Sequence, residues 1–233
     1  NECKSQLRQQ SSTSEKFIDP FWEQIKYEAN ESLKNQPEAG PQLYQGILSQ
    51  PSLIVAICCV LSHEVQTELI PATAVKNLFL ELLTPEDEYL IRLDLQAVAT
   101  RSPSVDSAFS ALLFHNGFHA IVCYRVGHRL WLAGRTGLAY YMQSIVSRKY
   151  SADIHPACKL GGGLYVRVGG GVVIGETAVV GNDVSILEGV TLGGTGKAGG
   201  DRHPKIGNGV IIHDGGTVLG NIIVGDGAVV GAM

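Results

Sequence analysis

A six-residue repeat fills the second half of the sequence and limits what that half can fold into. A period this short is typical of a β-helix, in which each hexad forms one flat face of a coil and three hexads complete a turn. We therefore predict an α + left-handed parallel β-helix protein, with the β-helix over 151–233. The aliphatic residues that should stack inside the coil are Ile154, Leu160 and Val166, then Ile174, Val180, Ile186 and Leu192, then Ile206, Ile212, Val218, Val224 and Val230.

The repeat is interrupted twice. The step from Val166 to Ile174 is eight residues, and the step from Leu192 to Ile206 is fourteen. Extra residues must bulge outward, because the interior of a solenoid has no room for them. We expect residues 193–205 to form a loop outside the coils, and functional residues tend to lie in such loops.

The predicted loop is rich in glycine and carries Arg202, His203 and two lysines. Its backbone amides and cations could hold an anionic or acylated ligand. A nucleotide-binding P-loop does not fit, because the preceding strand and the Lys-Ser/Thr ending are both missing.

The first half of the sequence reads as helical. Thr84, followed by a proline and three acidic residues, predicts a helix that runs to about residue 99. A second, longer helical pattern opens at 102–106 and reaches Leu130, and shorter helices are expected over roughly 15–33, 53–68 and 73–83. Near Tyr150 glycine becomes frequent and aromatic residues become rare, which predicts two domains, 1–150 and 151–233.

His115 and His119 are four residues apart and could share a helix face as metal ligands. No acid or cysteine nearby completes a ligand set, so we interpret them as packing or surface histidines and predict no metal site. The cysteines lack any paired spacing, which is typical of reduced intracellular thiols. They are Cys3, Cys58, Cys59, Cys123 and Cys158.

The net charge of −4 provides no basic field for nucleic acid or for an anionic membrane. The longest apolar run, 53–61, is far shorter than the roughly twenty residues needed to cross a bilayer. We therefore expect neither nucleic acid nor membrane as a partner. An intracellular, cytoplasmic location is expected, and organellar targeting stays open because the sequence begins with Asn1 rather than Met.

Several motifs resemble those of the serine acetyltransferase family. In the second half these are DIHP at 153–156, GETAV at 175–179, NDVSI at 182–186, VTLGGTGK at 190–197 and GDRHPKI at 200–206. The helical half agrees, with DLQAV at 94–98, GFHA at 117–120 and YRVGH at 124–128. Hexads alone would indicate only a broad class of acyltransferases, whereas the loop together with this helical half is specific.

The resemblance implies transfer of an acetyl group from acetyl-coenzyme A to the hydroxyl of L-serine, which supplies O-acetylserine for cysteine biosynthesis. It also implies a homotrimer or hexamer with active sites between neighbouring subunits. In this family a histidine, oriented by an aspartate, is the general base. The family docks O-acetylserine sulfhydrylase through a C-terminal tail. The sequence stops at Met233, inside a hexad, so we expect a truncated β-helix without that docking tail.

One part of the family's site is matched by this sequence. Asp153 corresponds to the orienting aspartate, and Arg202 and His203 correspond to the loop residues that hold the serine. By the same resemblance, acetyl-coenzyme A would be bound by Gly194, Thr195, Lys197, Asp214 and Ala232.

The other part of the site is altered. The family's Leu-Asp-His-Ala-Thr-Gly is Val-Arg-Val-Gly-Gly-Gly at 166–171, so Val168 stands at the position of the catalytic histidine and Arg167 at that of a substrate aspartate. Ser102 replaces a second substrate aspartate. A guanidinium and a hydroxyl in place of two carboxylates should repel an amino group. Asp214 replaces a small residue beside which the pantetheine arm lies, and would obstruct that groove.

Loss of a general base typically costs about two to four orders of magnitude in rate. We therefore expect a serine O-acetyltransferase homologue with impaired catalysis, in which Asp153 and His203 are the remaining catalytic residues. His155 and His203 are candidates for a substitute base. Two alternatives stay open: a non-catalytic family member that joins and regulates active subunits, and an acyltransferase whose acceptor has become an anion held by Arg167 and Arg202.

Overall fold

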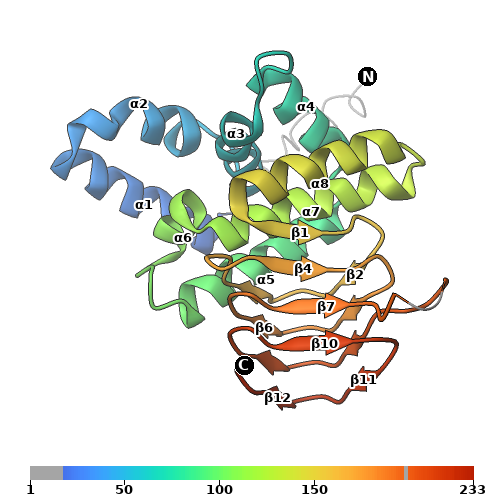
Figure 1. Ribbon diagram of the computed structural model, residues 1–233. Helices are drawn as coiled ribbons and strands as arrows, with labels where there is room; N and C mark the ends of the chain where they lie inside the picture. Colours follow the sequence, from blue (N-terminus) through green and yellow to red (C-terminus); the bar gives the residue numbers. More distant parts are fainter. Residues whose placement is uncertain (1–17, 197–198) are drawn as a thin grey trace, which may run out of the picture.

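A computed structural model describes residues 18–196 and 199–233. Helices occupy the first part of the chain and strands the second, and the change falls between Tyr150, where the last helix ends, and Ala152, where the first strand begins. The helices cover one end of the stack of strands, as Figure 1 shows. No helix in the described part of the chain is long and apolar enough to span a membrane.

The described helical part contains eight α-helices, with a 3-10 turn and a π turn between the first and the third. Their bounds are α1 Pro20–Asn35, η1 Pro37–Ala39, α2 Gly40–Leu43, η2 Tyr44–Leu48, α3 Leu53–Val65, α4 Ala72–Leu82, α5 Pro85–Arg101, α6 Ala108–Phe114, α7 Asn116–Leu132 and α8 Thr136–Tyr150. The start predicted for α5 is confirmed, because the Thr84 hydroxyl accepts a hydrogen bond from the Asp87 N–H and the Asp87 carboxylate accepts one from the Thr84 N–H.

The single long helix expected after residue 106 is wrong, because the chain breaks at His115 into α6 and α7. His115 has φ −91° and ψ 101°, and its Nδ1 accepts a hydrogen bond from the Phe118 N–H at 3.1 Å, so it caps α7. The Nε2 of His119 lies 2.8 Å from the carbonyl oxygen of Leu112. Both histidines are buried and bound to backbone groups, which agrees with their interpretation as packing residues. The segment 37–48 and α8 were not predicted.

Burial of His115 makes stability dependent on pH. Desolvation, helped by the neighbouring His119, lowers the pKa of His115 to about 4. The unfolded chain, with an ordinary pKa near 6.5, then binds the proton more tightly, so the free energy of unfolding should fall by about 2–3 kcal/mol as the pH drops from about 6.5 toward 4. His115→Asn keeps a capping acceptor and does not titrate. Denaturant unfolding at pH 7 and pH 4.5 should show a smaller loss in this variant, and an equal loss would contradict the assignment.

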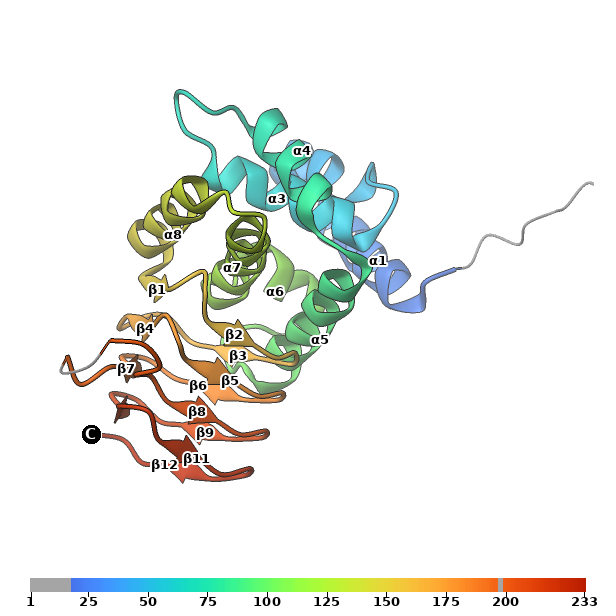
Figure 2. The ribbon, with the colours of Figure 1, turned by 90° about the vertical axis from the view of Figure 1, so that its right-hand side faces the viewer.

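Three parallel sheets of four strands form the sides of the coil. Sheet A contains β1 Ala152–Ile154, β4 Val172–Ile174, β7 Thr191–Gly193 and β10 Thr217–Leu219. Sheet B contains β2 Lys159–Leu160, β5 Val179–Val180, β8 Lys205–Ile206 and β11 Ile223–Val224. Sheet C contains β3 Tyr165–Val166, β6 Ser185–Ile186, β9 Ile211–Ile212 and β12 Val229–Val230. Figure 2, turned by 90°, brings sheet B to the front.

The strand register confirms the six-residue repeat. The aligned residues are Ile154, Ile174, Leu192 and Val218 in sheet A, then Leu160, Val180, Ile206 and Val224 in sheet B, then Val166, Ile186, Ile212 and Val230 in sheet C. In Figure 1 the chain runs from left to right along sheet A at the front and returns behind while it descends, which is a left-handed turn. The fold is therefore the predicted left-handed parallel β-helix.

Helix α7 holds the helical part onto the first coil. Gly117 packs so closely against β3 that a Cβ atom there would lie 1.7 Å from the carbonyl oxygen of Val166. Two turns further on, the Tyr124 hydroxyl donates a hydrogen bond to the carbonyl oxygen of Cys158 at 2.6 Å. The GFHA and YRVGH sequences thus supply residues that touch the coil.

A buried ion pair between two helices lies at the same boundary. Arg125 of α7 donates two hydrogen bonds to Oδ2 of Asp94 in α5, from Nε at 2.9 Å and from Nη2 at 2.6 Å. Their side chains are 3% and 1% exposed. Asp94 Oδ1 also accepts the N–H of Leu164 at 2.9 Å, and Arg125 Nη2 also donates to the carbonyl oxygen of Gly161 at 2.7 Å. The pair therefore ties both helices to the first coil.

The cysteines of the described residues, Cys58, Cys59, Cys123 and Cys158, are buried free thiols. Burial raises the pKa of the Cys58 and Cys158 thiols to about 12. These two thiols are therefore protonated packing groups and not nucleophiles. Cys3 lies outside the described residues.

Candidate active site

The two interruptions of the repeat lie at opposite ends of sheet A. Residues 194–204 follow β7, and residues 167–171 precede β4. We call residues 194–204, together with 155–157 and 175–177, the loop corner. We call residues 167–171, together with 187–189 and 213–215, the arginine corner. In Figure 1 the loop corner is at the right, and the arginine corner is at the left, near the end of the chain.

Thr177 organises the loop corner. Its hydroxyl oxygen accepts hydrogen bonds from the backbone N–H groups of Arg202 and His203, at 3.0 and 3.2 Å. The same hydroxyl lies 2.9 Å from Nδ1 of His203, which also accepts the Thr177 N–H at 3.1 Å. Nδ1 is thus the acceptor of the imidazole ring, so the proton of the neutral ring is on Nε2.

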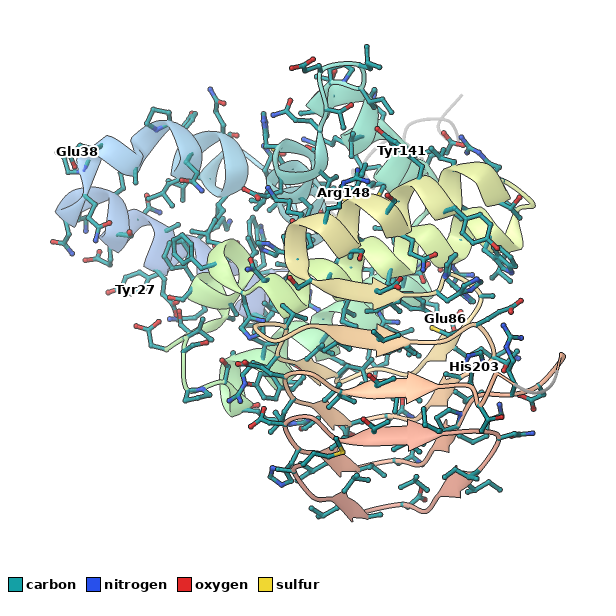
Figure 3. All side chains as sticks on the ribbon, in the orientation of Figure 1. Tyr27, Glu38, Glu86, Tyr141, Arg148 and His203 are labelled. Carbon is teal, nitrogen blue, oxygen red and sulfur yellow. The ribbon has the colours of Figure 1, made fainter. Side chains whose placement is uncertain are left out.

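His203 is fixed as a neutral donor. Burial lowers its pKa, and the charge of Arg202 lowers it further against the opposing effect of Glu176. Its ring lies directly over Gly175, where a Cβ atom would be 2.1 Å from Nε2. Figure 3 labels His203 at the edge of the coil, close to the point where the loop rejoins it. Because Nδ1 is engaged and Nε2 is protonated, the ring offers a hydrogen bond rather than a free lone pair, which suits substrate binding better than the role of a base.

His155 is held in a similar way. Its Nδ1 accepts the N–H of Ala157 at 3.1 Å, and its ring packs edge-on against Trp131 of α7 and Tyr140 of α8, with centroids 5.4 and 5.6 Å apart. Burial lowers its pKa, opposed by the charge of Glu176. His155 thus has the same engaged nitrogen as His203, and neither presents a ready base.

The loop itself is anchored by charge. Arg202 Nη2 donates to Glu176 Oε2 at 2.8 Å, and its side chain lies against Gly194, where a Cβ atom would be 3.3 Å from Arg202 Cγ. Thr195 lies over Gly220 of the next coil. Lys197 lies outside the described residues. An open groove of about 470 Å³ adjoins this corner, lined by Trp131, Ala157, Lys159, Glu176, Thr177, Ala178, Val179, Asp201 and Lys205.

The Thr177 hydroxyl should be required for loop order. Thr177→Val leaves the N–H groups of Arg202 and His203 without their acceptor, so we expect a loss of about 1–3 kcal/mol in the free energy of unfolding. Trypsin should also cut at Arg202 faster than in the parent chain. Thr191→Val on β7 is the matched control, because within the described residues that hydroxyl makes no hydrogen bond. Equal cleavage of both variants would refute the role of Thr177.

Arg167 dominates the arginine corner. Its Nη2 donates to Asp214 Oδ1 at 2.7 Å, and its Nε lies 2.9 Å from Glu188 Oε1. Asp214 Oδ1 also accepts the Glu188 N–H at 3.1 Å. Val168 is 7% exposed and carries no titratable group. Ala232, in register with Asp214, continues the same corner.

Ser102 is buried in the turn that follows α5. Its Oγ lies 2.8 Å from Oγ of Ser104 and accepts the Ser104 N–H at 3.3 Å. The adjacent Arg101 donates to the carbonyl oxygens of Gly163 and Asp183 on the coil. The turn is thus held against sheet C by hydrogen bonds that need no carboxylate at position 102.

One chain does not bring the predicted residues into one site. Gly194, Arg202 and His203 meet at the loop corner, and Arg167, Val168, Asp214 and Ala232 at the arginine corner. Asp153 points outward from sheet A, where its Oδ1 accepts a hydrogen bond from Gln143 Nε2 at 2.6 Å. The sequence reading missed Thr177 and Glu188 as functional residues. The hexad register carried the signal, because it places Thr177 at the loop corner and Glu188 at the arginine corner, where its side chain lies against Gly169.

Comparison with known proteins agrees with this architecture. The profile of the family described as "Serine acetyltransferase, N-terminal" matches residues 21–123. Serine acetyltransferase 2 of Arabidopsis thaliana is 46% identical over 181 residues, 77% of this chain and 56% of the relative. The soybean serine acetyltransferase complexed with serine has a TM-score of 0.88 and 43% identity, over 91% of this chain and 88% of that one. The Brucella abortus enzyme in complex with coenzyme A has a TM-score of 0.85 and 43% identity, over 90% and 87%.

A helical domain on a left-handed β-helix with one long loop is the architecture of the hexapeptide-repeat class of proteins. More narrowly, the chain belongs to the serine acetyltransferase family. It spans about half the length of the Arabidopsis relatives that it matches.

Proposed function

We propose that this chain is a serine O-acetyltransferase homologue, with acetyl-coenzyme A as donor and L-serine as acceptor, whose catalysis is impaired at the arginine corner. The observation that carries the proposal is Val168, a buried apolar side chain where the family has its base, next to an arginine already paired with two carboxylates. The relatives crystallised with serine and with coenzyme A support the choice of substrates.

The residues of the loop corner can still bind the serine and the acetyl group. Arg202 offers a guanidinium to the serine carboxylate, His203 offers its Nε2–H, and the Gly194 amide faces the acetyl group. Proton removal from the serine hydroxyl has no evident acceptor, because both histidines at this corner have an engaged Nδ1 and a protonated Nε2. Without that step the hydroxyl is a poor nucleophile toward the thioester.

A turnover assay tests the proposal. Release of free coenzyme A from acetyl-coenzyme A in the presence of L-serine should proceed about 10²–10⁴-fold more slowly than with Arabidopsis serine acetyltransferase 2 under the same conditions. A rate equal to that of the Arabidopsis enzyme would show that another residue supplies the base.

The second candidate function is that of a non-catalytic subunit, favoured by the separation of the two corners. If sites form between copies in a trimer or hexamer, this chain contributes an intact loop corner that needs a neighbour's histidine. We expect it to co-purify with an active relative and to restore activity to a relative whose own loop histidine is replaced. No observation favours the anionic acceptor, because Arg167 is already paired with Asp214 and Glu188.

A further inference from the structure

We propose that Arg167, Glu188 and Asp214 form an ionic clamp that closes the arginine corner to coenzyme A. The choice of ligand rests on the proposed function. The clamp itself rests on the arrangement of these three side chains, which come from three successive coils.

The register fixes how the clamp runs. Arg167 follows Val166, and the residues that pair with Val166 down sheet C are Ile186 and then Ile212. Glu188 and Asp214 each follow two positions after those residues. Neighbouring strands are about 4.8 Å apart, so the Arg167 side chain spans about two strand spacings to reach Asp214. It therefore lies along the outside of the corner, parallel to the axis of the coil.

Packing leaves the clamp little freedom. A Cβ atom on Gly169 would lie 2.8 Å from the carboxylate carbon of Glu188, so the backbone of the turn at 167–171 packs directly on that side chain. Asp214 Oδ1 is held from two directions, by Arg167 Nη2 and by the Glu188 N–H. The Arg167 side chain is only 36% exposed. An extended ligand that lies along the coil at this corner would need the same space.

The charges of the clamp act against the same ligand. An isolated exposed ion pair stabilises little, but here one guanidinium meets two carboxylates, which leaves a net charge of about −1 at the corner. This charge repels the phosphates of coenzyme A, and the guanidinium that could attract them is already paired. The clamp thus excludes the ligand by shape and by charge together.

Calorimetric titration of the full chain with coenzyme A tests the clamp. The first opened variant, Glu188→Gln with Asp214→Ala, removes both carboxylates and leaves Arg167 unpaired. The second, Arg167→Ala with Glu188→Gln and Asp214→Ala, also removes the side chain that lies along the corner, so that neither the shape nor the charge of the clamp remains. We expect each to bind coenzyme A at least about tenfold more tightly than the parent. Asp226→Asn, at the corner between sheets B and C, is the control for the loss of one negative charge and should match the parent.

Two results would overturn the clamp: a parent affinity equal to that of both opened variants, or no binding by any of them although circular dichroism shows that they are folded. Either result is independent of the turnover rate with serine. A parent chain that acetylates serine as fast as an active relative would refute the proposed function instead, while the ratio of coenzyme A affinities judges the clamp alone.

Discussion

Restoring three residues should raise serine acetylation by about two to four orders of magnitude, the usual contribution of a general base. The changes are Val168→His, which supplies the base, and Ser102→Asp with Arg167→Asp, which supply carboxylates for the substrate ammonium. Positions 167 and 168 lie at the arginine corner and position 102 in the turn after α5, so none of the three changes alters the contacts of the loop corner. The measurement is kcat/KM for L-serine at saturating acetyl-coenzyme A.

The structure adds a condition to this experiment. Arg167→Asp would place a third carboxylate beside Glu188 and Asp214, and like charges this close repel one another. A fourth change, Asp214→Ala, removes that conflict and opens the groove. We therefore expect the fourfold variant to exceed the triple variant in kcat/KM. The triple variant should still exceed Val168→His alone, which has a base but no ammonium pocket.

A displaced histidine is the matched control. Val229→His adds an imidazole at an exposed position on β12, outside the arginine corner, and should leave the rate unchanged. If the fourfold variant is folded and still no faster than the parent, then loss of the arginine corner is not the cause of impaired catalysis.

The fold could be predicted from the sequence because the decisive pattern is local. Within each uninterrupted run the inward positions of the coil, such as Ile174, Val180 and Ile186, recur every six residues, and the register then aligns them without further information. The two irregular steps marked the loop corner and the arginine corner for the same reason. The resemblance to the family also predicted that Arg167 and Val168 stand at the positions of functional residues.

The interactions that the site residues make were harder to predict from the sequence. Arg167 meets Asp214 across 47 positions of sequence, and a salt bridge between coils has no signature other than charge in a correct register. The break at His115 was missed because a histidine cap is a weaker signal than a Ser, Thr, Asp or Asn cap. The engaged nitrogens of His155 and His203 depend on backbone donors, and no side-chain pattern reveals those.

Breaking the buried pair between Asp94 and Arg125 should destabilise the protein more than any single change at the site. Asp94→Ala leaves the guanidinium of Arg125, 3% exposed, without its counter-charge, and leaves the Leu164 N–H without its acceptor. Removal of one partner of a buried pair typically costs about 3–5 kcal/mol. For a chain of this size that corresponds to a fall of roughly 10 °C in the melting temperature.

The pair between Lys149 and Glu64 is the matched control. Its atoms are 2.7 Å apart, but its side chains are 38% and 41% exposed, so Glu64→Ala should cost no more than about 1 kcal/mol. Replacing both buried charges, by Asp94→Leu with Arg125→Met, should cost less than Asp94→Ala because no unpaired charge remains. Thermal unfolding followed by circular dichroism measures all three variants. If Asp94→Ala costs as little as Glu64→Ala, then packing at Gly117 and the Tyr124 hydrogen bond, rather than the ion pair, hold the helices to the coil.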